Sequence, residues 1–232
     1  MFGLLPGDVA LVVAPHLDDE TLGAGGTIHR LASCGVTVHV LAVCCRTGPM
    51  WAGHSDPGLR GKEFNAACDA LGVAGRLLAW ADNDHAHSPA AHQRELVTLI
   101  ESGTELSLAA ARPTLLLTPA AGGFHQDHQA VHAACFAAAR AGGEAKPTPR
   151  LVLGYMGPEE VAWNAAAGAP TVYVDTTAHW PAKETALTAY ASQLREGTHP
   201  RSIPAIRAID TATGAAIGTA LAERFIPYRL AY

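Results

Sequence analysis

Short, strongly apolar runs alternate along the chain with longer stretches in which apolar residues recur at helical spacing. The short runs are rich in β-branched and aliphatic residues, which is typical of strands buried on both faces of a sheet. The predicted strands are Val9–Ala14, Val36–Cys45, Arg76–Trp80, Thr114–Thr118, Leu151–Tyr155 and Thr171–Val174. The predicted helices are Thr21–Cys34, Leu59–Leu71, Pro89–Glu101, Asp127–Ala141 and Ala182–Arg195. This alternation predicts βαβ units, and therefore an α/β fold with a parallel sheet covered by helices on both faces.

Composition is that of a folded chain without a linker. Of its 232 residues, 49% are hydrophobic and 16% are charged. Disordered chains combine low hydrophobicity with high charge. This composition is the opposite and excludes a disordered chain. We therefore expect a single domain over residues 1–232. Two polar segments, Arg46–Gly58 and Ala81–Ser88, are expected to be loops, and the chain after Arg195 shows no regular pattern.

Charge and cysteine content indicate which partners and which cellular compartment to expect. Lys and Arg total 16 against 21 Asp and Glu, for a net charge of −5, and the basic residues are not clustered. Nucleic acid is therefore not an expected partner. The apolar runs fall well short of the ~20 residues that span a bilayer, and no basic region precedes the N-terminal run, so neither membrane insertion nor a signal peptide is expected. Five cysteines, without a C-x-x-C motif, favour reduced thiols in a cytoplasmic protein.

The first predicted strand leads directly into a dense group of titratable residues, P-H-L-D-D-E at positions 15–20. Desolvating adjacent carboxylates is costly unless a cation compensates their charge. One alternative is a plain helix N-terminus, where acidic residues favour the helix dipole and Asp18 or Asp19 caps the helix. Capping needs only one carboxylate and does not account for His16, so the group favours a chemical site.

A second group of this kind, F-H-Q-D-H at positions 124–128, follows a later strand and opens a helix. In open parallel sheets, ligands bind beyond the carboxyl ends of the strands. If the two strands are neighbours, the residues that converge are His16, one of Asp18 and Asp19, and one of His125 and His128. Two His and one carboxylate form a three-ligand zinc set that leaves a fourth position for water. The remaining carboxylate and His are then free for proton transfer.

Together, P-H-L-D-D-E and the later H-Q-D-H resemble the paired motifs of the PIG-L/LmbE family of zinc-dependent N-deacetylases. The usual first motif is P-H-P-D-D-E, so Leu17 departs from it at a position that should only shape the turn. Weaker matches are Thr47-Gly48, Arg60–Glu63, Ala70–Gly72, Asp82 and Lys183–Gln193. The resemblance implies a Rossmann-like, three-layer α/β/α fold with its active site at the carboxyl ends of the strands. It also implies removal of N-acetyl groups from N-acetylglucosamine-type substrates.

The resemblance further implies a role for individual residues. It implies His16, Asp19 and His128 as metal ligands, Asp18 as the general base, His125 as the residue that stabilises the oxyanion or protonates the leaving amine, Arg60 and Asp82 as contacts to sugar hydroxyls, and Asp127 as an acid that orients a neighbouring His. One Zn²⁺ per chain is expected, although a two-His, one-carboxylate set also suits iron or another divalent ion. A protonated His125 would complement the metal at the oxyanion.

Other signals in the sequence are better read as structural. His132 lies four residues after His128, as in helical zinc pairs, but no Glu follows the first His, and a ligand role is not expected. Gly23 to Gly26 resemble a dinucleotide-binding loop but do not lie directly at the strand end, so close packing is the better interpretation. The adjacent Cys44 and Cys45 are expected on opposite faces of a strand end.

The sequence therefore predicts a metal-dependent hydrolase that acts on a small amino-sugar substrate and releases acetate and a free amine. One alternative is an amidase that cleaves a larger amide of a thiol–sugar conjugate. Another is a sugar-binding or metal-binding protein without turnover, which would need neither Asp18 nor His125. Whether Asp82 or Asp84 faces the sugar is left open, because Asn83 stands where the family often has Gly. Several family members assemble, so a homo-oligomer is also left open.

Overall fold

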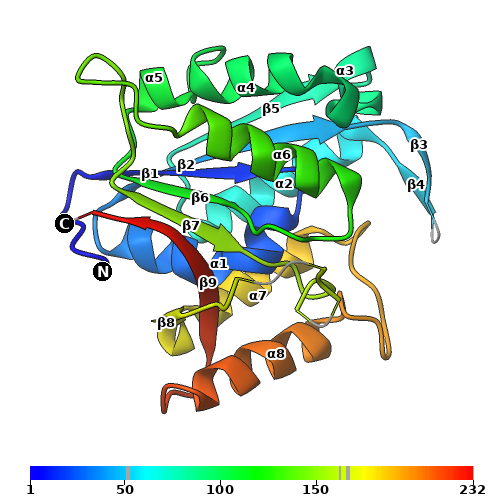
Figure 1. Cartoon of the computed structure of the whole chain (residues 1–232). Coiled ribbons are helices and arrows are strands. Elements are labelled where there is room, and N and C mark those ends of the chain that lie inside the picture. The colour runs from blue at the N-terminus through cyan, green and yellow to red at the C-terminus, as the bar shows by residue number, and fades with distance from the viewer. Residues whose placement is uncertain (51–52, 162, 166–167, 232) are drawn as a thin grey trace.

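Seven strands form one mixed sheet in the order β5-β2-β1-β6-β7-β9-β8 (Figure 1). The structure is a computed structural model that describes residues 1–50, 53–161, 163–165 and 168–231. The strands of this sheet are β1 Val9–Ala14, β2 Thr37–Cys45, β5 Gly75–Ala81, β6 Leu115–Pro119, β7 Leu151–Tyr155, β8 Val172–Asp175 and β9 Ala222–Leu230. The five strands from β5 to β7 pair in parallel, whereas β9 runs antiparallel to both β7 and β8.

Helices cover both faces of the sheet and make a three-layer α/β structure (Figure 1). One face carries α1 Asp19–Ser33, α2 Pro57–Leu71 and α7 Trp180–Ala189. The other carries α3 Asp84–His87, α4 Gln93–Glu101, α5 Leu108–Ala111 and α6 Gln126–Ala138. Helix α8, Ile203–Ala215, packs beside β9. Among the described residues, no helix has the length and apolar character needed to cross a bilayer.

The apolar run of β1 feeds a separate core on each side of the sheet. Ala10 and Val12 pack into the core beneath α1, α2 and α7, while Leu11 and Val13 pack into the core beneath α4 and α6. Alternate residues of a strand point to opposite faces, so a strand buried on both sides needs an unbroken apolar run. The prediction of a doubly covered sheet is therefore confirmed.

The carboxyl-terminal part of the chain differs from the prediction. The region after Arg195, expected to be irregular, contains α8 and the long strand β9. Strand β9 mixes buried and half-buried residues without a regular period, and its pairing with β7 shifts register where Val152 pairs with Arg229 and Leu153 with Pro227. Charged residues and a proline in this strand weaken its sequence signal. The sheet is consequently mixed rather than fully parallel.

Three further local predictions were wrong. The segment Ala81–Ser88, expected to be a loop, contains the short helix α3. The segment Arg46–Gly58, expected to be a loop, contains a short antiparallel pair, β3 Gly48–Met50 and β4 Gly53–Ser55, while residues 51–52 of that loop lie outside the described part. Helix α7 ends at Ala189 instead of reaching Arg195. The next residue, Tyr190, is buried and donates a hydrogen bond of 2.6 Å to Glu20, which fixes the chain where it leaves the helix.

The glycines of α1 allow close packing, as predicted. A Cβ on Gly26 would lie 2.7 Å from the side chain of Thr176, and one on Gly23 would overlap the ring of Tyr155. Real side chains do not approach so closely, and therefore only glycine lets this helix lie against its neighbours. These positions are filled by protein atoms and serve packing.

Candidate active site

Strands β1 and β6 are direct parallel neighbours, with Ala10 paired to Leu115 and Val12 to Leu117. The segments that follow them, residues 15–18 and 120–125, therefore leave the sheet at the same edge and open α1 and α6. The two motifs could meet only if their strands were neighbours, and they are. Residues more than 100 positions apart, such as His16 and Asp127, are therefore in contact.

The turn between β1 and α1 directs its two aspartates to different partners. Asp18 has a φ of 140°, a conformation that non-glycine residues adopt only when the surrounding structure enforces it. Its side chain makes no capping hydrogen bond, so the interpretation of this motif as a plain helix cap is wrong. Asp18 faces two arginines, whereas Asp19 faces two histidines.

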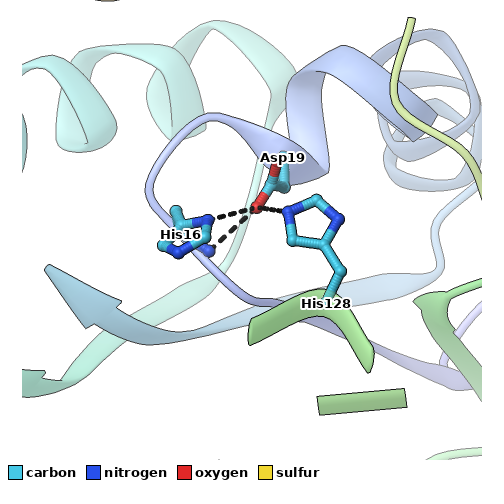
Figure 2. A group of neighbouring side chains, drawn as sticks. All are labelled: His16, Asp19 and His128. Carbon is cyan, nitrogen blue, oxygen red and sulfur yellow. Dashed lines mark hydrogen bonds and ion pairs between the residues drawn. The ribbon is translucent and has the colours of Figure 1, made fainter. Parts of the chain in front are cut away.

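The side chains of His16 and His128 both point to one carboxylate oxygen of Asp19 (Figure 2). Oδ2 of Asp19 lies 3.2 Å from Nδ1 of His16 and 3.1 Å from Nε2 of His128, and it also accepts the backbone N–H of His16 at 2.9 Å. Ligands on a tetrahedral zinc ion, with bonds of ~2.0–2.2 Å, lie about 3.3 Å apart. These two nitrogen–oxygen distances match the spacing that a small divalent cation requires, and the three ligand atoms all lie within 4.8 Å of one another.

The second ring nitrogen of each histidine is hydrogen-bonded to a further carboxylate. Nε2 of His16 lies 3.0 Å from Asp127, and Nδ1 of His128 lies 2.9 Å from Glu160. Carboxylates in these positions fix the orientation of ligating imidazoles in metal sites. Burial alone would lower the pKa of His128, but Asp19 and Glu160 outweigh it and raise the pKa to about 9. The same balance, with Asp127 and Asp19 as partners, raises the pKa of His16.

Asp18 lies beside this cluster and is only 2% exposed. Its carboxylate lies 3.3 Å from Nη1 of Arg201 and 3.6 Å from Nη2 of Arg60. Burial raises its pKa above the ordinary value, Arg201 and Arg60 oppose this rise, and the charge of Asp19 adds to it. Asp18 is thus a carboxylate whose proton affinity is increased but whose ionised form still has cationic partners, as a general base requires.

His125 caps α6 and faces the cavity as a neutral imidazole. Its Nδ1 accepts the backbone N–H of Asp127 at 3.2 Å. Burial and the neighbouring His16 and His128 lower its pKa to about 4. The lowered pKa favours a neutral His125 in the resting site, and a protonated His125 at the oxyanion stays a prediction. A neutral ring with Nδ1 as acceptor carries its hydrogen on Nε2, which makes that atom a donor.

A cavity of about 200 Å³ adjoins these groups. Its lining includes His16, Asp18, Arg60, His125, Asp127 and Arg201. Arg60 donates to the carbonyl of Leu17 at 2.6 Å, while its buried Nε has no partner in the described part of the chain. Arg60 therefore lines the cavity, and its contact with a substrate stays a prediction.

Asp82 lies in the turn after β5 and contacts Thr47. Its oxygens accept the backbone N–H and the hydroxyl of Thr47, at 2.5 and 2.7 Å, and its side chain is exposed. It is not among the residues that line the cavity. The neighbouring Asn83 caps α3 through Ala86. Both positions serve the turn after β5 in this structure, and a sugar contact from Asp82 stays a prediction.

The structure adds two charged residues that the sequence did not reveal. Glu160 lies on the segment after β7, the strand next to β6, and a search of every strand end would have found it. Arg201 lies just before α8, in a region without a predicted pattern, and it pairs with Glu159 as well as Asp18. No local sequence signal marks Arg201.

The fold and the cluster define a class: a three-layer α/β protein with a His-Asp-His group and a free aspartate at the carboxyl ends of its central strands. The family model described as PIG-L, GlcNAc-PI de-N-acetylase, matches residues 11–139, which is more than half of the chain. The chain belongs to the PIG-L family.

Relatives with named activities are similar over much of the chain. A probable N-acetyl-alpha-D-glucosaminyl L-malate deacetylase 2 from Bacillus cereus is 30% identical over 206 residues, which cover 82% of this chain and 87% of the relative. A 1D-myo-inositol 2-acetamido-2-deoxy-alpha-D-glucopyranoside deacetylase from Rhodococcus erythropolis is 36% identical over 154 residues. That match covers 56% of this chain and 52% of the relative, so the chain spans about half of its length.

Solved structures share the fold over nearly the whole chain. The conserved protein TT1542 from Thermus thermophilus superposes with a TM-score of 0.72 at 27% identity, covering 99% of this chain and 97% of the other. The A40926 pseudoaglycone deacetylase Dbv21 superposes with a TM-score of 0.73 at 24% identity, over 96% and 98% of the two chains. A 4-carboxy-2-hydroxymuconate hydratase, GalB, also has this fold, at 20% identity and a TM-score of 0.68. The fold alone therefore does not determine the reaction.

Proposed function

We propose that the protein is a zinc-dependent N-deacetylase that removes the acetyl group from an N-acetylglucosamine-type sugar or its conjugate. The observation that carries the proposal is the convergence of His16 and His128 on Asp19, with Asp18 beside them but bound to neither histidine. The relatives from Bacillus and Rhodococcus, which are named as deacetylases of such sugars, support the substrate class.

His16, Asp19 and His128 would hold the metal, and each offers one ligand atom. When bound there, a divalent ion supplies Lewis-acid chemistry, because it increases the acidity of a water and polarises an amide carbonyl. Asp127 and Glu160 keep the two imidazoles oriented through their outer nitrogens. Zinc suits this donor set, and iron is the main competitor.

Asp18 would take the proton from the attacking water. As the water oxygen bonds to the carbonyl carbon, the proton passes to Asp18, whose ionised form Arg60 and Arg201 support. The oxyanion that develops meets the Nε2–H of His125 as a hydrogen-bond donor; one such donor typically contributes ~10²–10³ in rate. When the carbon–nitrogen bond breaks, the proton on Asp18 transfers to the leaving nitrogen, which yields acetate and a free amine.

The alternatives differ in what they require of these residues. A sugar-binding or metal-binding protein without turnover needs no unliganded carboxylate beside the metal cluster, yet Asp18 is held there in a strained backbone conformation. That observation favours catalysis. An amidase acting on a larger thiol–sugar amide would use the same residues, and the substrate assay must separate it from a deacetylase.

The test is acetate release from N-acetylglucosamine, its inositol glycoside and its malate glycoside by metal-loaded protein, beside amine release from a larger thiol–sugar amide. Asp18→Asn should lower kcat by ~10²–10⁴, as loss of a general base does, while metal content by mass spectrometry stays at one ion per chain. Asp69→Asn, on the exposed side of α2 where the side chain pairs with Arg76, is the control and should keep full activity. Acetate release that survives in Asp18→Asn, or no release from any acetylated sugar, would overturn the proposal.

A further inference from the structure

A second group of potential ligands lies next to the first and shares one residue with it. His16, Cys44 and Asp127 each offer a ligand atom, and these three atoms lie within 4.8 Å of one another. All three residues line the cavity. The set contains a thiol, whereas the His16–Asp19–His128 set contains none.

The carboxylate of Asp127 has an unused acceptor in this second group. The residue is 5% exposed, and its Oδ2 contacts Nε2 of His16 at 3.0 Å. Its Oδ1 is buried and has no hydrogen-bond partner among the described residues. A buried carboxylate oxygen without a partner is costly, and a cation is one group that satisfies it.

Cys44 is held at the cavity end of β2 with its thiol on the active-site side. Its Sγ donates a weak hydrogen bond to the carbonyl of Pro15 at 3.5 Å. The adjacent Cys45 belongs to the opposite core, and its Sγ contacts Ser55 at 3.9 Å. Alternation along the strand therefore presents one of the two thiols to His16 and Asp127.

We propose that Cys44, Asp127 and His16 form a second, inhibitory site for thiophilic divalent cations such as Cd²⁺ or Zn²⁺ in excess. A soft thiolate selects such ions over hard ones such as Mg²⁺. On binding, the Cys44 thiol releases its proton to solvent and the sulfur bonds to the cation. His16 belongs to both groups, with Nδ1 toward Asp19 and Nε2 toward Asp127. A cation in the second group binds Nε2, whose proton also passes to solvent, and so breaks the contact to Asp127 that orients the ring in the first group.

Binding at this site does not depend on the proposed function, whereas inhibition rests on it. The experiment separates the two by measuring binding directly. Equilibrium dialysis of the full chain against Cd²⁺ should give two ions per wild-type chain, with a cadmium–thiolate charge-transfer band in the ultraviolet. Cys44→Ser should bind one ion and lack that band. Cys45→Ser is the matched control and should bind two ions and keep it.

Activity then tests the inhibitory role. Each protein is first loaded with one Zn²⁺, and its acetate release is compared with its own rate after further Zn²⁺ is added. Wild type and Cys45→Ser should lose at least tenfold, and Cys44→Ser should lose less than twofold.

Three results would overturn the inference: a single Cd²⁺ per wild-type chain, a thiolate band that persists in Cys44→Ser, or equal inhibition of Cys44→Ser and Cys45→Ser. If no acetylated sugar is hydrolysed, the proposed function fails, while the dialysis result still decides whether the second site exists.

Discussion

Two regions of the protein bury several charges, and they differ in how those charges are compensated. Between α7, α8 and β9, Nζ of Lys183 lies 2.8 Å from Asp210 and 2.7 Å from Glu223. Glu223 also accepts the backbone N–H groups of Gly26 and Thr27, at 2.9 and 2.8 Å. Every member of this triad has a partner supplied by the chain, and the triad joins α1 to the outer elements.

The cluster at the ends of β1 and β6 is organised differently. Among the described residues, Asp19 contacts two imidazoles and the backbone N–H of His16, and Asp18 contacts guanidinium groups that also line a cavity. The ligand atoms face one another instead of a lysine. The difference shows how to recognise a site: buried charge with internal partners holds the fold, whereas buried donors that converge on a common point beside a cavity are arranged for a ligand.

The largest expected loss of activity follows from removing the cation from the His16–Asp19–His128 cluster. Chelation, or His128→Ala, should abolish acetate release, because without the cation the water is less acidic and the amide carbonyl is not polarised. Zinc at about 1,000 times its Kd should stabilise the wild type by ~4 kcal/mol, an increase in Tm of roughly 8–16 °C for a domain of this size. Calorimetry with and without zinc measures this.

His132→Ala is the control for that experiment. His132 lies one helical turn further along α6, and its Nδ1 contacts the carbonyl of Pro119 at 2.9 Å. It should keep both activity and the zinc-dependent rise in Tm. A His128→Ala variant that retains the full rise would mean that His128 is not a ligand.

The triad should respond to substitution through stability alone. Lys183→Met leaves Asp210 and Glu223 buried without their cation, which typically costs ~3–5 kcal/mol. Urea unfolding should show this loss, and the one-zinc stoichiometry of the folded protein should be unchanged. Lys62→Met, on the exposed side of α2, is the control and should lie within ~0.5 kcal/mol of wild type. Equal midpoints for the two variants would show that the triad does not carry this role.

The fold was easier to predict from the sequence around the central strands than around the Lys183 triad. Strands buried on both faces have unbroken apolar runs, so β1, β2, β6 and β7 were evident from the sequence. Strand β9 was not, because charged residues and a proline interrupt its apolar residues, and because antiparallel pairing needs no intervening helix. Lys183 was noted only as part of a weak motif, and its partners lie in the region without a pattern.

The site was predictable where residues follow directly on buried strands. His16, Asp19 and His128 lie there, and the structure brings them together. Arg201 could not be found in this way, since its position depends on how the chain returns from α7, which no local pattern encodes. The protonation of His125 was also beyond the sequence, because it depends on burial and on two neighbouring imidazoles.

A smaller effect should follow from changing a residue that only orients a ligand. Glu160→Gln keeps the shape but weakens the contact to Nδ1 of His128, and changes of this kind typically cost 10–100-fold in metal affinity. Competition with a chromophoric chelator measures the affinity. Glu159→Gln is the neighbouring control; it pairs with Arg201 and contacts neither histidine, so its metal affinity should match wild type. A ratio near one for Glu160→Gln would remove Glu160 from the site.

The smallest expected effect is a pH dependence of stability from the triad. Burial raises the pKa of Asp210 to about 6, with Glu223 adding to the rise and Lys183 opposing it. A carboxyl group whose folded pKa is raised favours the folded state when protonated, so its contribution is full below pH ~4 and is lost as the pH rises through about 6. Asp210→Asn removes the titration, and the difference in unfolding free energy between wild type and this variant should shift against wild type from pH 4 to 7.

The opposite sign is expected at Asp175, a half-buried carboxylate at the end of β8. A hydrogen bond from the backbone N–H of Thr177 lowers the pKa of Asp175, so its contribution is present above its unfolded pKa of ~3.9 and is lost as the pH falls. Urea titrations of Asp210→Asn and Asp175→Asn at each pH should therefore diverge from wild type in opposite directions. If both variants instead diverge from wild type in the same direction, Lys183 keeps Asp210 ionised in the folded protein over the whole pH range. The triad would then be an ordinary ion pair, and the contrast with the converging donors of the other region would rest on geometry alone.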